Sequence, residues 1–594
     1  MGPVSDELVM RPICFNSTVG WLHEPEQGAH RLDRAVVIAS PHGFEELSSR
    51  RTLRMLGERL AAAGVTALRF DWSGEADALG DSCDPDRLTA WRGDLLAALD
   101  LVKRASGASD LAVVGLRLGA LMAADLGGRH DDVTRVALLA PPPSGRGYVR
   151  ELRALARVMA PAVAAGDAPF SGVSVAGFRT SRDTMNALSA WCFSDLTAPP
   201  APQARIVAPE NALGANVAAR RLEALGTSVT RADFPGYDRM LCDPTASEAA
   251  LEILDPLVEW LADGAAPAAS ATDPLVGRRS NIAADFIEEP VCFGENARFA
   301  GVLCQPTGVE TGPPVMFLNA GGAHHVGWAR MTVTQARHLA ARGVASLRID
   351  LPGVGDSGGG EHLARQHYYL ASQRDAVSAA LDLLEDLGYP QARVMGACSG
   401  AHHAFHAAAG DSRIVDAMIV NVQIFVWEEQ RRFPLDAWMN SRAYDLGMRT
   451  RVADAETAAL ARLQARLTVG AIAIAKSSAR KALGMLHKAQ GARTAFDPIG
   501  ATTPIATQLA RMCERGARVM FVFGEDDAGR AEFETHFGPG GANALAMDGV
   551  DLRLIPATDH PITPEAARAR LLEILEEWCG VAVEAAQTNT RIAS

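Results

Sequence analysis

The strongest chemical signal lies in RVMGACSGA, residues 393–401, which places a cysteine between two glycines. Gly396, Cys398 and Gly400 follow the pattern Gly-x-nucleophile-x-Gly, in which the nucleophile lies on a tight turn between a strand and a helix. The flanking positions must be small so that strand and helix can close around the turn. A helix N-terminus favours a thiolate, because its dipole and free N–H groups stabilise negative charge. The stretch therefore predicts nucleophilic chemistry at Cys398.

A shift of one residue gives a second candidate nucleophile. Ser399 has Ala397 and Ala401 two positions away on either side, and both are small. The alternative to a catalytic role is that Cys398 is a buried cysteine beside a flexible Ser-Gly turn. We favour Cys398 because it has the two glycines that the turn requires.

Short apolar runs that alternate with amphipathic stretches would position this turn. Near-continuous apolar strands separated by helices indicate a mostly parallel sheet with helices on both faces. By contrast, residues 427–505 show no strand pattern, and their long helical periodicity predicts a helical insertion. The predicted strands are 315–319, 345–350, 393–396, 417–422, 517–524 and 552–557, and the predicted helices include 329–342 and 375–388.

The same module occurs twice in the chain, with an offset of 278 to 281 residues between matching segments. A repeat of whole-domain size indicates a duplication. The run DGAAPAASATDP, residues 263–274, has no apolar period and is typical of a linker. We therefore expect one copy at 1–262, a second at 275–580 and a polar, frayed tail at 581–594. The segments that recur are 12–15, 60–71, 92–102 and 113–123, which match 290–293, 339–350, 373–384 and 394–404.

Composition limits the classes of protein that the chain can belong to. The 594 residues are 48% hydrophobic and 21% charged, as in globular proteins with large cores. The net charge of −13 argues against a general surface for nucleic acid or anionic membranes. Nine cysteines without CxxC spacing predict neither a disulfide framework nor a zinc site, which fits the cytoplasm. We find no signal-peptide pattern and no apolar run long enough to span a bilayer, so we expect no stable membrane insertion.

Over almost all of both copies the chain resembles the α/β-hydrolase superfamily. The resemblance implies two tandem α/β-hydrolase domains, each a mostly parallel, doubly wound sheet with a helical cap, which in the second copy is the insertion at 427–505. The family's residue order is nucleophile, acid, histidine. This order implies Asp527 in the turn FGEDD as the acid, with Asp526 as the alternative, and His560 in ATDHP as the histidine. His560 would accept the thiol proton, and Asp527 would orient the imidazole and stabilise its charged form.

The resemblance also implies an oxyanion hole formed partly by the loop NAGGAHH, residues 319–325. The backbone N–H of Ser399 would be one donor, and Gly321 and Gly322 would let the loop approach the substrate closely. Asn319 and the pair His324 and His325 are candidate side-chain donors, and His324 is also a candidate contact for a substrate or carrier. A solvated loop is the alternative for both histidines.

No cofactor or metal is expected. His402 and His406 have the i, i+4 spacing of metal ligands, but no third ligand is evident, so packing of their helix is the favoured interpretation. The glycine-rich run GVGDSGGG, residues 353–360, follows a strand in both copies, which favours a loop of the fold over a phosphate cradle.

The first copy keeps the scaffold and lacks the chemistry. Its elbow reads GLRLG, with Arg117 at the nucleophile position, and no histidine follows His130 until His324. A guanidinium cannot attack a carbonyl at neutral pH. Arg117 either binds an anionic group of a substrate or carrier, or forms an internal ion pair. The motif GLRLGA also resembles hydrolase-like proteins found with exosortase and exopolysaccharide systems, and GxCSGA resembles their tandem relatives.

The expected cap contains several basic residues, including Lys476 and Arg480, although the chain as a whole is acidic. A basic surface there would receive the phosphates of coenzyme A or an acidic acyl-carrier protein. The alternative is a solvated helical face.

These observations predict an enzyme of acyl transfer, an acyltransferase or thioesterase, because a thiolate exchanges readily with thioesters. Its substrate would be an acyl thioester of coenzyme A or acyl-carrier protein, or an ester, in lipid, polyketide or polysaccharide biosynthesis. No nucleic acid is expected as a partner, and a homodimer is left open. The alternatives are a plain carboxylic-ester hydrolase and, from another class, a non-catalytic scaffold in which both copies serve docking.

Overall fold

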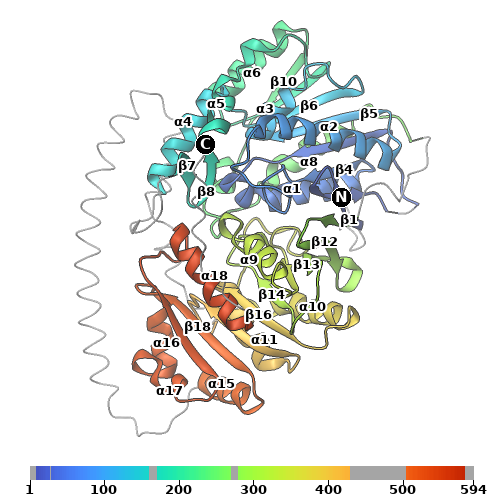
Figure 1. Ribbon diagram of the computed structural model, residues 1–594. Coiled ribbons are helices and arrows are strands. Elements are labelled where there is room, and N and C mark those ends of the chain that lie inside the picture. Colours follow the sequence, from blue (N-terminus) through green and yellow to red (C-terminus); the bar gives the residue numbers. More distant parts are fainter. Residues whose placement is uncertain (1–8, 27, 160–169, 269–278, 428–503, 582–594) are drawn as a thin grey trace.

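The computed structural model describes residues 9–26, 28–159, 170–268, 279–427 and 504–581. These residues form two large sheets, one in each copy (Figure 1). The N-terminal copy, coloured blue to green, lies above the C-terminal copy, coloured yellow-green to red. No helix in the described part of the chain is both long and apolar enough to cross a membrane.

The N-terminal sheet has eight strands in the order β1-β2-β4-β3-β5-β6-β9-β10. β1, β2 and β4 pair antiparallel, and the pairs from β4 onward are parallel. Its strands are β1 (Val9–Phe15), β2 (Thr18–Glu24), β3 (Arg34–Ala39), β4 (Thr66–Phe70), β5 (Asp110–Leu116), β6 (Val133–Leu139), β9 (Gln203–Val207) and β10 (Ser228–Ala232). Its helices are α1 (Phe44–Ala62), α2 (Arg87–Ser106), α3 (Leu118–Ala124), α4 (Gly145–Val158), α5 (Arg182–Ala190), α6 (Leu213–Ala224), α7 (Tyr237–Met240) and α8 (Leu254–Ala262).

The C-terminal sheet repeats this order as β12-β13-β15-β14-β16-β17-β18-β19, with the short strand β11 added at the β12 edge. Its strands are β11 (Asn281–Ile282), β12 (Phe286–Phe293), β13 (Phe299–Pro306), β14 (Val315–Leu318), β15 (Ser346–Ile349), β16 (Ala392–Ala397), β17 (Ile414–Val420), β18 (Arg518–Gly524) and β19 (Val550–Ile555). Its helices are α9 (Met331–Ala340), α10 (Asp375–Asp386), α11 (Ser399–Gly410), α15 (Pro504–Glu514), α16 (Gly529–Phe537), α17 (Ala542–Leu545) and α18 (Glu565–Cys579). The two tandem, mostly parallel sheets that the sequence predicts are therefore present.

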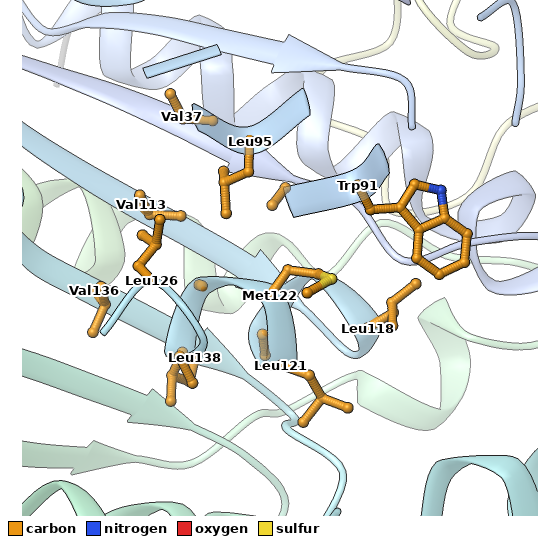
Figure 2. Packing of buried hydrophobic residues seen from close by; sticks show 14 of the residues in the cluster. Val37, Trp91, Leu95, Val113, Leu118, Leu121, Met122, Leu126, Val136 and Leu138 are labelled. Carbon is orange, nitrogen blue, oxygen red and sulfur yellow. The ribbon is translucent and has the colours of Figure 1, made fainter. Parts of the chain in front are cut away.

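Apolar side chains from strands and helices meet in the core of each copy. In the N-terminal copy, Val37, Val113 and Val136 project from the sheet toward Leu95 of α2 and Met122 of α3 (Figure 2). All five are buried, and each fully buried side chain of this size stabilises the fold by about 1.5–3 kcal/mol. This packing fixes the start of α3, where the N-terminal elbow lies. The equivalent C-terminal core includes Met316, Val394 and Phe405, which fix the start of α11.

Insertions before the next-to-last strand differ between the copies. In the N-terminal copy this region holds α4, α5 and a hairpin of β7 (Gly172–Val175) and β8 (Phe178–Ser181). The cap expected at 427–505 lies outside the described residues, apart from Trp427 and the start of α15. Lys476 and Arg480 lie outside them as well.

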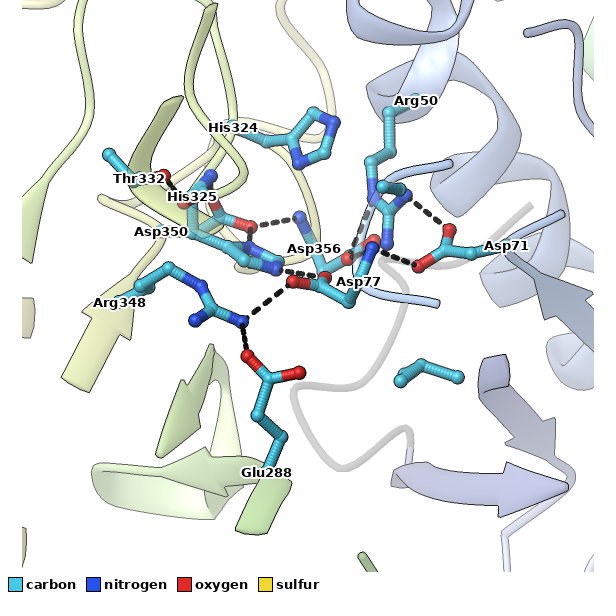
Figure 3. Close-up of polar contacts among 12 residues, drawn as sticks. Arg50, Asp71, Asp77, Glu288, His324, His325, Thr332, Arg348, Asp350 and Asp356 are labelled. Atoms are coloured by element: carbon cyan, nitrogen blue, oxygen red, sulfur yellow. Dashed lines mark hydrogen bonds and ion pairs between the residues drawn. The ribbon is translucent and has the colours of Figure 1, made fainter. Parts of the chain in front are cut away.

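Reciprocal ion pairs join the two copies in a buried layer (Figure 3). Asp77 of the N-terminal copy pairs with His325 at 2.6 Å and Arg348 at 3.0 Å in the C-terminal copy. In return, Asp356 of the C-terminal copy pairs with Arg50 of the N-terminal copy at 2.7 Å. Asp77 and Asp356 are 279 positions apart, which is an offset found between matching segments of the two copies, so they occupy equivalent positions. The duplicated loop therefore provides each copy with a carboxylate that pairs with cations of the other.

These charges keep one another ionised. Burial alone would lower the pKa of His325, but the carboxylates of Asp350 and Asp77 raise it well above its usual value. Burial alone would raise the pKa of Asp77, yet His325 and Arg348 hold it well below its usual range. Leaving one partner of such a buried pair alone costs roughly 3–5 kcal/mol. The pairs therefore favour one way for the copies to meet.

Candidate active site

The turn between β16 and α11 has the geometry of a nucleophile elbow at Cys398. Its backbone has φ 54° and ψ −117°, a strained conformation for a residue other than glycine. A β-carbon on Gly396 would lie 2.1 Å from the Gly400 carbonyl oxygen, and one on Gly400 would lie 2.1 Å from that of Asn319. Both positions therefore exclude any larger residue. The structure places Cys398, and not Ser399, on the turn.

Ser399 lies inside the first turn of α11 and is buried. Its hydroxyl oxygen accepts a hydrogen bond from the backbone N–H of Gly321, at 2.8 Å. The side chain thus holds the 319–325 loop against the elbow.

His560 and Asp527 meet beside the elbow, although 33 residues separate them. Nδ1 of His560 donates to Oδ2 of Asp527 at 2.6 Å. The other oxygen, Oδ1, accepts from the Gln423 side-chain amide and from the backbone N–H of Gly529, both at 2.8 Å. The neighbouring Asp526 is exposed. Both Asp527 oxygens are therefore bonded, which fixes the carboxylate and, through it, the imidazole.

The imidazole of His560 also forms a hydrogen bond with the Cys398 thiol. Burial would lower the pKa of His560, but the charge of Cys398 and hydrogen bonds to Asp527 and Cys398 raise it to about 10. At neutral pH His560 therefore holds a proton beside the Cys398 sulfur. A protonated imidazole in this position can give its proton to a leaving group.

Tyr369 and Gln423 also line the site, and no motif in the sequence pointed to either. The Tyr369 hydroxyl hydrogen-bonds Cys398, while its ring packs edge-on against His402 at 5.3 Å and stacks on Trp427 at 5.1 Å. Burial raises the pKa of Tyr369 well above its usual value, and the charge of Cys398 raises it further. Tyr369 therefore stays protonated and can donate to the sulfur. It lies in the irregular segment between β15 and α10, where no periodicity marks single residues.

Comparison with family models divides the chain as its sheets do. A model described as the alpha/beta hydrolase fold matches residues 313–488, and one described as serine aminopeptidase, S33, matches residues 32–186. The chain belongs to the α/β-hydrolase superfamily. No curated protein matches the sequence. The narrower resemblance to exosortase-associated members of the superfamily stays a prediction.

Solved structures with 14–19% identity match parts of the chain. Est1E from Butyrivibrio proteoclasticus has 16% identity and a TM-score of 0.31, covering 42% of this chain and 97% of its own. Brefeldin A esterase, titled a bacterial homologue of human hormone sensitive lipase, has 19% identity and a TM-score of 0.31, covering 44% and 79%. Dienelactone hydrolase from Anabaena variabilis has 15% identity and a TM-score of 0.29, covering 51% and 97%. None of these likenesses bears on the reaction.

The predicted oxyanion loop lies beside the hydrolase elbow, but Asn319 does not serve there as expected. Its side-chain amide donates to the carbonyl of Ala323 at 3.1 Å and to Asp350 at 2.9 Å, and its oxygen accepts from Leu351 N–H. Asn319 is buried and shapes the loop from below. The prediction that it adds a donor to the oxyanion hole is therefore wrong.

His324 is also placed differently from the prediction. It is buried between the two copies, where Nε2 lies 2.9 Å from Oε2 of Glu46 in α1. A substrate or carrier contact at His324 is therefore wrong, as is its alternative, a solvated loop. Its neighbour His325 is buried too and belongs to the ion-pair layer of Figure 3.

In the N-terminal copy, Arg117 occupies an elbow of the same geometry, with φ 54° and ψ −109°. Its guanidinium is buried, pairs with Glu45 at 3.1 Å and with Glu151, and lies over the Tyr148 ring. Of the two interpretations left open, the internal ion pair fits, and the substrate contact does not. The strained backbone remains after the nucleophile has gone, because Gly115 and Gly119 still pack as closely as their counterparts.

Histidines on α11 are bound to backbone carbonyls. His402, His403 and His406 each donate to one, at 3.0, 2.7 and 2.7 Å. This supports helix packing over metal binding.

Among the described residues, His325, Asp350 and Asp356 offer atoms within 4.8 Å of one another, close enough to hold a metal ion. However, His325 bonds Asp77 and Asp350, and Asp356 bonds two arginines of the N-terminal copy. The negative charge of this cluster is therefore balanced by positively charged side chains of the protein.

Proposed function

We propose that the C-terminal copy is an acyl-transfer enzyme, an acyltransferase or thioesterase, with Cys398 as nucleophile, His560 as acid–base and Asp527 as orienting acid. The observation that carries this proposal is a connected set of contacts. Cys398 lies on the strained elbow and is hydrogen-bonded to His560, and Nδ1 of His560 bonds Asp527 at 2.6 Å. Nucleophile, base and orienting group thus form one connected chain, which is the arrangement that covalent catalysis requires.

The reaction would proceed in two steps. The Cys398 sulfur attacks the acyl carbonyl carbon and forms an S–C bond, while the carbonyl electron pair moves to oxygen. When the bond to the leaving thiol or alcohol breaks, the His560 imidazolium gives that group its proton. An incoming alcohol, amine or water then attacks the thioester of the acyl-enzyme and gives its proton to His560. Cys398 leaves as thiolate, and the thiolate–imidazolium pair is restored.

The choice of a thiol supports thioester chemistry. The acyl-enzyme is itself a thioester, so exchange with an acyl thioester substrate is nearly balanced in energy, and amines or alcohols capture it readily. Coenzyme A or an acyl-carrier protein is accordingly our proposed acyl donor, within lipid, polyketide or polysaccharide biosynthesis. The proposed contacts of such a donor with Lys476 and Arg480 concern a segment outside the described residues.

A plain ester hydrolase is the second candidate, and the hydrolase family models that match both copies favour it. Rapid turnover of short p-nitrophenyl esters without an added acceptor would support it over transfer. A non-catalytic scaffold predicts instead that Cys398 is no more reactive than the other eight cysteines.

The test is intact-mass spectrometry after brief exposure to acyl-coenzyme A or acyl-N-acetylcysteamine. Wild type, Cys398→Ala and Ser399→Ala are compared. We expect an acyl adduct that disappears in Cys398→Ala and persists in Ser399→Ala. The absence of an adduct over a range of chain lengths, with ordinary alkylation of Cys398, would contradict the proposal.

A further inference from the structure

The loop of residues 319–325, here called the oxyanion loop, is held by a series of buried polar contacts that begins in the N-terminal copy. Nε2 of His325, the last residue of the loop, donates to Oδ2 of Asp77 at 2.6 Å (Figure 3). On the other side of the ring, Nδ1 donates to Oδ2 of Asp350 at 2.8 Å. All three side chains are buried. One carboxylate from each copy therefore binds the same imidazole.

Asp350 connects this imidazole to the first residue of the oxyanion loop. Its Oδ1 accepts from the backbone N–H of His325 at 2.7 Å and from the side-chain amide of Asn319 at 2.9 Å. The same amide donates to the carbonyl of Ala323 at 3.1 Å, within the loop. Because Asn319 and His325 are the two ends of the loop, Asp350 fixes where these ends lie relative to each other.

The middle of the oxyanion loop touches the elbow directly. The backbone N–H of Gly321 donates to Oγ of Ser399, the residue after Cys398, at 2.8 Å. A β-carbon on Gly400 would lie 2.1 Å from the carbonyl oxygen of Asn319. Loop and elbow are therefore in close contact, and a displacement of the loop would change where its backbone N–H groups lie relative to the Cys398 sulfur.

The N-terminal copy contacts the oxyanion loop at further places. Nε2 of His324 lies 2.9 Å from Oε2 of Glu46 in α1, and a β-carbon on Gly322 would lie 2.0 Å from the carbonyl oxygen of Pro244. The loop is thus packed between its own elbow and the other copy. Of these contacts, the one made by Asp77 places a buried carboxylate on the loop, so its position has the largest electrostatic consequence.

We propose that Asp77 of the N-terminal copy is a positioning residue of the C-terminal active site, which holds the oxyanion loop in place through His325 and Asp350. This inference rests on the proposed function, in which the acyl carbonyl oxygen becomes negative when Cys398 attacks and backbone N–H groups stabilise that charge. Asp77 acts through the loop and not on the substrate. The copy without a nucleophile then takes part in the reaction of the other copy.

The experiment compares two reactions of the same sulfur. Acylation by acyl-coenzyme A places negative charge on a carbonyl oxygen, so its rate depends on the oxyanion hole. In alkylation by iodoacetamide, the Cys398 sulfur bonds to the methylene carbon as iodide leaves, and no carbonyl oxygen gains charge. The ratio of the two rates therefore reports the oxyanion loop, whereas a change in Cys398 or His560 would alter both rates. Intact mass follows acylation, and the mass of the Cys398 peptide follows alkylation.

Three variants are compared with wild type. Asp77→Asn removes the charge and keeps an oxygen that can accept from His325. His325→Gln breaks the same series of contacts at its next residue, and serves as the second variant if Asp77→Asn does not fold. Arg51→Met is the control, because Arg51 of α1 crosses between the copies to backbone carbonyls in residues 360–364, outside the loop. Thermal unfolding of each variant checks that the fold is intact.

In Asp77→Asn and in His325→Gln we expect the ratio of acylation to alkylation to fall by about tenfold to a hundredfold, less than the roughly hundredfold to thousandfold loss caused by removing a whole oxyanion donor. Arg51→Met should keep the wild-type ratio. Hydrogen exchange, measured on a peptide that contains residues 319–325, should become faster in the first two variants and stay unchanged in Arg51→Met.

An unchanged ratio in a folded Asp77→Asn, or an equal fall in Arg51→Met, would overturn the inference. Failure of the proposed function would appear differently, as the absence of an acyl adduct in wild type. Hydrogen exchange needs no acyl donor and would then decide alone: faster exchange of the oxyanion loop in Asp77→Asn would support its positioning by Asp77, and unchanged exchange would overturn it.

Discussion

Replacing Asp527 with asparagine tests the charge arrangement of the candidate active site most directly. Asparagine keeps an oxygen that can accept from His560 Nδ1 and loses the negative charge. The adjacent Asp526 provides a matched control, because it lies in the same turn and is exposed.

The expected magnitude follows from the pKa of His560. A value of about 10, compared with an ordinary 6.5, corresponds to roughly 5 kcal/mol in favour of the imidazolium, at 1.36 kcal/mol per pKa unit. A carboxylate in direct contact accounts for about 1 to 3 units of such a shift. When the rate of Cys398 alkylation is followed against pH, loss of the His560 proton should give an inflection. In Asp527→Asn we therefore expect this inflection to move down by about 1 to 3 pH units. The rate of acyl-enzyme formation should fall by about tenfold to a thousandfold.

Two measurements check this prediction on the same protein samples: peptide-resolved alkylation of Cys398 against pH, and the rate of acyl-adduct formation by intact mass. Asp526→Asn should match wild type in both. An unchanged inflection in Asp527→Asn, or an equal loss in Asp526→Asn, would refute the assignment of Asp527 as the residue that orients His560.

Three further predictions follow from the structure. Tyr369→Phe removes a hydrogen bond to the Cys398 sulfur. Such a bond to a charged group contributes about 1.5–3 kcal/mol, so the thiolate absorbance at 240 nm at neutral pH should decrease. An unchanged absorbance would contradict this prediction. Gly400→Ala should lower the free energy of unfolding, measured in urea, by about 1–3 kcal/mol or more, because its β-carbon would be crowded at the elbow. Gly410→Ala is the control, because a β-carbon at this helix end would meet no other atom, and it should have little effect. Equal losses in the two variants would exclude crowding at the elbow as the cause. The pairing of the copies should weaken at both pH extremes. Asp77, whose pKa is depressed, contributes stability that is lost as pH falls below about 4 toward its folded-state pKa. His325, whose pKa is raised, contributes stability that is lost as pH rises from its ordinary pKa through its raised one. Melting temperatures from pH 3 to 11 that show no decline at either end would contradict this.

Local geometry explains what the sequence by itself determined. Gly396, Cys398 and Gly400 mark the elbow because a strained strand-to-helix turn excludes β-carbons at fixed positions, and this constraint involves few residues. The apolar runs predicted both sheets, since strands buried on both faces need apolar side chains along their whole length. The nearly constant offset between matching segments predicted two copies with the same strand order.

Contacts between distant residues were decided only by the tertiary structure. Adjacent carboxylates in a turn look alike in a sequence, and packing alone places Asp527 on His560 and Asp526 in solvent. Tyr369 reaches the elbow from an irregular segment that no periodicity marks. His324 appeared to belong to the active site because of its loop, yet it is buried against Glu46, 278 residues away.

The relation between the two copies is the clearest case. Sequence patterns showed that the N-terminal copy had lost its nucleophile and histidine, and therefore what it could not do. What it contributes depends on where its loops lie after the copies pair, and that position is set by buried charges that cross between them, such as Asp77 with His325 and Arg50 with Asp356. Side-chain partners across an interface have no spacing rule along the chain, so their pairing follows from the folded geometry alone.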